Sequence, residues 1–148
     1  RVYIRDASTL ELLDSASVVA GPIPRAGVGD NVTYRNGRET LLMRVNSWWE
    51  EPSPRDPGRL KRVVLNVTFL NAFSNGTVDT GYVIGHAMSD RGRVAYGNMS
   101  ELSYRVLGPG EEVTGLIYIP APKDFIPVEV CVCGVDRVIT LKKPESSN

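Results

Sequence analysis

The chain has 148 residues, with 17 basic side chains balanced by 17 acidic ones. This length is most simply one domain that buries its own hydrophobic core. A net charge of zero provides no one-sided field for nucleic acid or an anionic membrane, and no apolar run approaches the roughly 18 residues of a membrane span.

The first 38 residues differ from the rest. Residues 1–6 are polar and alternating rather than a signal peptide, so an exported protein would be numbered from its mature start. Two apolar stretches within this segment, at residues 2–4 and 10–20, are expected to be extended. The pattern of residues 8–19 is compatible with either a strand or a helix. We expect residues 1–38 to be either an extended arm or an extra first hairpin. As an arm, the segment would act as a donor strand through alternate apolar side chains: Leu10, Leu12, Val18 and Ala20.

Residues 39–143 alternate between apolar and polar side chains. Val63, Leu65 and Val67 are apolar, for example, whereas Arg62 and Asn66 are polar. This period of two predicts strands at 40–47, 61–73, 81–88, 93–97, 102–107, 112–119, 127–133 and 138–141. Turn sequences rich in Gly, Pro, Asn and Asp separate them. We predict an all-β fold, an immunoglobulin-like or jelly-roll antiparallel β-sandwich of about seven to nine strands, followed by a polar tail at 144–148.

Three stretches carry a resemblance to a known family: 62–71, a strand ending in Asn; 81–96, with the Asp90-Arg91-Gly92 hairpin; and 107–120, with Pro109-Gly110-Glu111 before a strand. In this order, residues 41–141 resemble an immunoglobulin-like extracellular domain family of bacterial and archaeal lipoproteins and surface proteins. The resemblance implies the sandwich fold rather than a particular function. In overall plan the chain is also similar to archaeal filament subunits, glycosylated sandwiches whose terminal strand completes a neighbour's sheet.

No constellation of residues predicts catalysis. His86 is the single histidine, has no nucleophile near it in sequence, and is expected to be structural. Cys131 and Cys133 would share one face of a strand, about 6.6 Å apart. Free thiols, a strained local bridge and a bond to another chain all remain open for this pair. No second ligand pair predicts a metal site, and scattered acidic residues leave calcium between loops open. We therefore expect a non-enzymatic protein without a cofactor.

Trp48 and Trp49 are adjacent, so in a strand they point to opposite faces. One of the two is expected in the core, and the other is a candidate exposed aromatic for binding a ligand or carbohydrate.

Four Asn-x-Ser/Thr tripeptides are the strongest local signal, at Asn31, Asn66, Asn75 and Asn98. They predict N-linked glycans and hence an extracellular protein. The absence of Gln, the 13 Arg against four Lys and the 10 Pro suggest a thermophilic source, although the Arg excess fits a GC-rich genome equally.

Two functions remain in competition. The first is a subunit of an extracellular filament or surface assembly, a homopolymer joined head-to-tail by strand donation. The alternative is a monomeric surface or lipoprotein module that binds a carbohydrate, a ligand or a protein partner.

Overall fold

The computed structural model describes residues 2–4, 6–8, 24–97 and 99–141. The predicted donor residues Leu10, Leu12, Val18 and Ala20 lie outside these ranges, as do Asn98 and the predicted tail at 144–148.

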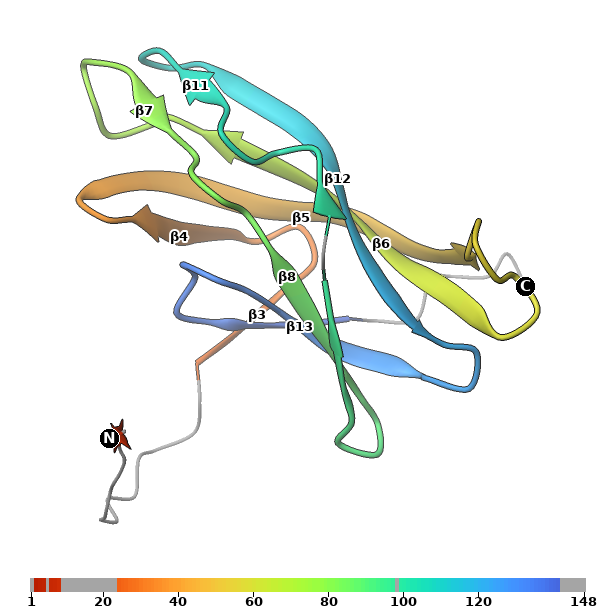
Figure 1. The fold of residues 1–148 in the computed structure, drawn as a ribbon. Helices are drawn as coiled ribbons and strands as arrows, with labels where there is room; N and C mark the ends of the chain where they lie inside the picture. The colour runs from red at the N-terminus through yellow and green to blue at the C-terminus, as the bar shows by residue number, and fades with distance from the viewer. Residues whose placement is uncertain (1, 5, 9–23, 98, 142–148) are drawn as a thin grey trace.

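Two five-stranded sheets face each other (Figure 1). The first, sheet I, has the order β10 (Met99–Ser100), β12 (Glu112–Pro122), β6 (Leu60–Leu70), β5 (Glu39–Pro52) and β4 (Asn31–Asn36). The second, sheet II, has the order β3 (Arg25–Gly27), β14 (Val138–Thr140), β13 (Pro127–Val132), β8 (Gly85–Ser89) and β9 (Val94–Tyr96). Two small pairs, β7 (Val78–Asp79) with β11 (Val106–Leu107) and β1 (Val2–Ile4) with β2 (Asp6–Ser8), complete the described strands.

Alternation along the strands builds the core between the sheets. In β6 the side chains of Val63, Leu65, Val67 and Phe69 are fully buried, and Ile117 and Ile119 of β12 join the same cluster. The predicted all-β sandwich is therefore confirmed. The described residues contain no helix, and hence none long and apolar enough to cross a membrane.

A β-bulge in β5 decides which tryptophan enters the core. Leu41, Met43 and Val45 point inward, but the pairing with β6 shifts by one residue between Val45 and Ser47. A bulge inserts one extra residue and so reverses the facing of everything after it. Trp48 is consequently buried at 8% exposure, and its inclusion among the candidate exposed aromatics was wrong. The strand also continues to Pro52, five residues beyond its predicted end.

The sandwich begins before the predicted boundary at residue 39. β4 pairs along its whole length with β5, and β3 pairs in parallel with β14. Val32 and Tyr34 of β4 are core residues. Residues 25–36 are therefore edge strands of the body, one in each sheet, rather than part of an arm or of a single hairpin.

The strand predicted at 102–107 is mostly a turn. Only Val106–Leu107 is strand, and Tyr104 has a positive φ of 59°. Thr80 fixes this turn, because its hydroxyl donates to the carbonyl of Leu102 (2.6 Å) and accepts from the amide of Arg105 (2.9 Å). This side chain satisfies backbone groups that a strand would otherwise pair, and it lies more than twenty positions away in the sequence, so the turn could not be predicted from residues 102–107 alone.

Candidate functional site

A row of apolar side chains crosses the outer face of sheet I. Trp49 of β5 lies opposite Val64 of β6, Val64 opposite Tyr118 of β12, and Tyr118 opposite Met99 of β10. Val64 is completely buried although it faces away from the sandwich core. Trp49 and Tyr118 are half-buried, while Met99 remains 56% exposed at the end of the row.

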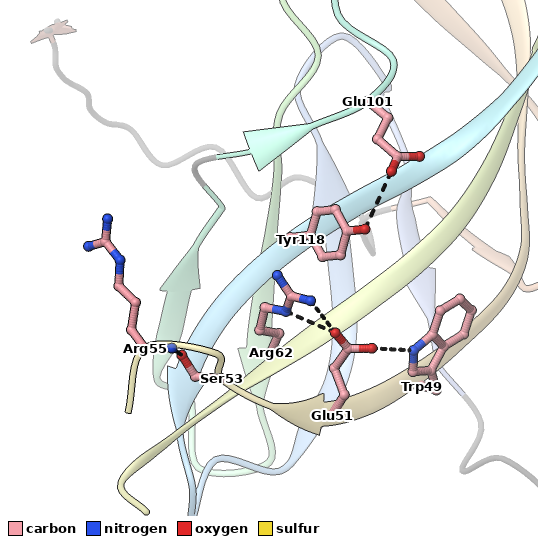
Figure 2. Close-up of polar contacts among 7 residues, drawn as sticks. All are labelled: Trp49, Glu51, Ser53, Arg55, Arg62, Glu101 and Tyr118. Atoms are coloured by element: carbon pink, nitrogen blue, oxygen red, sulfur yellow. Dashed lines mark hydrogen bonds and ion pairs between the residues drawn. The ribbon is translucent and has the colours of Figure 1, made fainter. Parts of the chain in front are cut away.

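Charged side chains are held against this row (Figure 2). Glu51 accepts from the indole N–H of Trp49 (3.0 Å) and from Nε of Arg62 (3.0 Å). The Arg62 guanidinium in turn lies over the ring of Tyr118, 4.3 Å from its centroid. Hydrogen bonds from Arg62 and then Trp49 lower the pKa of Glu51 below its usual value, so this carboxylate stays ionised.

Glu101 holds the other end of Tyr118. Its Oε2 lies 3.4 Å from the Tyr118 hydroxyl, and its Oε1 accepts from the backbone N–H of Leu116 (2.9 Å). Burial, followed by the negative charge of Glu101, raises the pKa of Tyr118. The phenol therefore stays neutral, with the Arg62 guanidinium over its ring and Glu101 beside its hydroxyl.

An open groove of about 260 Å³ lies at the Tyr118–Met99 end of the row. It runs between the turn after β5 and the β10–β12 edge, and its walls mix apolar and cationic side chains: Ser53, Pro54, Arg55, Leu60, Arg62, Met99, Tyr118 and Pro120. A face with an aromatic ring, an apolar floor and two guanidinium groups can bind a ligand by stacking and hydrogen bonding.

Sequence analysis found only Trp49 of this surface. The missed members, Arg62, Tyr118 and Met99, come from three strands that pair only in the folded chain. Val64 could have indicated this surface from the sequence alone, because it is an apolar residue at a position expected to face outward.

His86 and the two cysteines come together on the outer face of sheet II. Cys131 lies opposite His86, and the Cys133 sulfur is 3.8 Å from His86 Nε2. The Tyr96 ring packs edge-on against the imidazole, with centroids 4.9 Å apart. Both cysteines are free thiols, and burial followed by the charge of Cys133 raises the pKa of Cys131. Within the described ranges no three His, Cys, Asp or Glu side chains group closely enough to hold a metal ion.

The described sequons differ in exposure. Asn31 and Asn75 are exposed. Asn66 is half-buried in the central strand β6, and its Oδ1 accepts from Asn46 (2.9 Å). The Thr68 hydroxyl of the same sequon is also bonded, to Thr114 (2.7 Å).

Comparison with solved structures identifies two similar folds. A secreted protein of Mycobacterium tuberculosis, MPT63, is 18% identical with a TM-score of 0.62, and the match covers 82% of this chain and 99% of that one. An uncharacterised β-sandwich protein of Clostridium difficile 630 is 9% identical with a TM-score of 0.58, covering 86% and 98%. No protein-family model matches the chain, and no curated protein matches it by sequence. At these identities the two structures establish a shared β-sandwich fold, which agrees with the immunoglobulin-like resemblance at the level of architecture.

Proposed function

We propose that this chain is a non-enzymatic, N-glycosylated extracellular structural protein that assembles head-to-tail by strand donation. One observation carries the proposal. Strands from residues 25 to 140 build both sheets and bury the core between them, and the alternating apolar residues Leu10, Leu12, Val18 and Ala20 precede the first of these strands in the sequence.

An alternating apolar segment and an unpaired sheet edge are complementary. The edge of a sheet presents unpaired N–H and C=O groups, and an extended segment of another chain satisfies them in a ladder while its alternate side chains pack inward. Because donor and acceptor are different surfaces, the contact is heterologous and propagates into a filament instead of closing. The exposed sequons Asn31 and Asn75, together with the secreted nature of the Mycobacterium tuberculosis neighbour, support an extracellular location.

The test uses the full chain, purified and examined by electron microscopy and light scattering. We expect fibres from the wild type and single chains from the double variant Leu12→Asp, Val18→Asp, because burying two unpaired carboxylates against the acceptor sheet is costly. The matched control, Ser15→Asp with Ser17→Asp, adds the same charge to the opposite face of the segment and should still form fibres. A wild type that stays a single compact chain at every concentration would reject strand donation.

A second candidate function is supported by the groove beside Tyr118. Its aromatic ring and the guanidinium groups of Arg55 and Arg62 suit an oligosaccharide, which would make the chain a binding module. Titration with a panel of neutral and acidic oligosaccharides, followed by intrinsic fluorescence, tests this. Met99→Ser should weaken binding, whereas Phe73→Ser, equally exposed but outside the groove, should not. No binding, or equal binding by both variants, would dismiss this candidate.

A further inference from the structure

The outer face of sheet II brings both cysteines of the chain to its single histidine. Cys131 of β13 is the cross-strand partner of His86 of β8, and Tyr96 of β9 is the partner of His86 on the other side. Cys133 follows just after β13, and its amide donates to the carbonyl of Ile84 (3.0 Å), so the backbone stays beside the chain that leads into β8. Its sulfur lies 3.8 Å from His86 Nε2. The two thiols therefore flank the same imidazole.

The two thiols are not equivalent. Cys133 is exposed, whereas Cys131 is half-buried. Burial, followed by the charge of Cys133, raises the pKa of Cys131. The thiolate is the form of cysteine that attacks a disulfide, and the rate of attack depends on thiolate content and on access from solvent. We therefore expect Cys133 to react first with a reagent from solvent and Cys131 to react second.

His86 is oriented to donate a hydrogen bond to the Cys133 sulfur. Its Nδ1 is buried and, among the residues that the structure describes, has no hydrogen-bond partner. A neutral imidazole carries one N–H, and buried N–H groups without an acceptor are rarer in proteins than acceptors without a donor. We therefore place the proton on Nε2, which faces the sulfur. A donor at this position stabilises the negative charge that passes between sulfur atoms during thiol–disulfide exchange.

A bond between the two sulfurs is within reach of the backbone. Residues two positions apart in a strand have side chains on the same face and are separated by about 6.6 Å. Disulfides join residues whose Cα atoms are up to about 6.8 Å apart, so Cys131 and Cys133 are near the upper end of that range. A bridge at this limit is strained and is therefore reduced more readily. Such spacing suits a disulfide that forms and opens again.

We propose that Cys133 and Cys131 are a thiol–disulfide exchange pair, in which Cys133 attacks a small external disulfide, R–S–S–R, and Cys131 resolves the mixed disulfide. In the first step the Cys133 thiolate bonds one sulfur of the reagent, and RS⁻ leaves. In the second step the Cys131 sulfur attacks that of Cys133, the bond between the two cysteines forms, and a second RS⁻ leaves.

The reaction balances without a further reactant. The two protons lost by the protein thiols end on the two released RSH molecules, so two cysteines are oxidised and one external disulfide is reduced. The reverse reaction with two RSH molecules restores the free thiols. His86 is a positioning residue in both directions. The exchange goes beyond the proposed assembly and needs no contact between chains.

Incubation of the reduced, full-length protein with oxidised glutathione tests the pair. After an acid quench, intact-mass measurement and peptide mapping follow the products. We expect the wild type to lose two hydrogens, with the new bond between Cys131 and Cys133 of one chain. Cys131→Ser should stop at a glutathionyl adduct on Cys133. Cys133→Ser should form its adduct about tenfold more slowly, because the remaining thiol is half-buried. In urea-unfolded protein, as the control, the two single variants should react at similar rates.

Two substitutions at His86, each made in the Cys131→Ser background, test the imidazole. His86→Phe keeps a ring against Tyr96 but removes the donor, whereas His86→Gln keeps an N–H that can reach the sulfur. We expect the Phe variant to form the adduct about threefold more slowly than its parent, as for the loss of one hydrogen bond, and the Gln variant to recover most of the rate. Equal rates in all three proteins would overturn the role of His86.

Three results would overturn the exchange pair itself. These are a wild type that keeps two glutathionyl adducts, equal rates for folded Cys131→Ser and Cys133→Ser, and a bond between two chains in place of one within the chain. If circular dichroism shows Cys131→Ser unfolded, Cys131→Ala replaces it. Because masses are measured on separated chains, each result is independent of whether fibres form, and failure of the pair leaves strand donation standing.

Discussion

The buried phenol of Tyr34 links the stability of the sandwich to alkaline pH. Tyr34 is 2% exposed, donates its hydroxyl hydrogen to the carbonyl of Thr80 (2.7 Å), and packs edge-on against Phe69. Burial, followed by the charges of Cys133 and Asp79, raises the pKa of Tyr34 from 10.0 to about 12. The folded state therefore holds this proton more tightly than the unfolded chain does.

The sign and size of the effect follow from linkage. The contribution of this group is fully present below pH 10, and it is lost as the pH rises through the folded value of about 12. A shift of two units corresponds to about 2.7 kcal/mol. Tyr34→Phe removes the titrating group and leaves the buried Thr80 carbonyl without its donor, which costs about 1–3 kcal/mol at neutral pH. The difference in stability between wild type and variant should thus be greatest below pH 10 and shrink towards pH 12.

Urea unfolding followed by the fluorescence of the buried Trp48 measures this difference. The comparison is best made in the Leu12→Asp, Val18→Asp background, so that assembly does not contribute. Tyr104→Phe is the control, because Tyr104 is 67% exposed and the change should stay within about 0.5 kcal/mol of the parent. A Tyr34→Phe difference that stays constant from pH 8 to 12 would refute the linkage argument.

Two further predictions concern single sites. Gly134→Ala should destabilise the fold by more than about 2 kcal/mol in urea unfolding, because a Cβ at this position (φ 104°) would lie 2.7 Å from the Tyr34 ring. The control is Gly29→Ala, which has a similar φ of 96° but open space around it, and it should cost only the backbone strain of about 1 kcal/mol. In protein from its native source, peptide mass spectrometry should find the exposed Asn75 glycosylated to a higher fraction than Asn66, whose amide and partner hydroxyl are tied into the sheet; a higher fraction at Asn66 would contradict this reasoning.

Much of the fold could be predicted because local alternation and turn chemistry agree with the global structure. β6, β12 and β13 begin within one residue of their predicted starts, since each is an uninterrupted alternating run flanked by turn residues. The bulge in β5 could not be predicted, because it depends on pairing with β6 and leaves no mark in the sequence of β5 alone.

The candidate surfaces were less accessible from sequence for the same reason. Tyr118 and Arg62 are 56 positions apart along the chain, and only the β6–β12 pairing places the guanidinium over the ring.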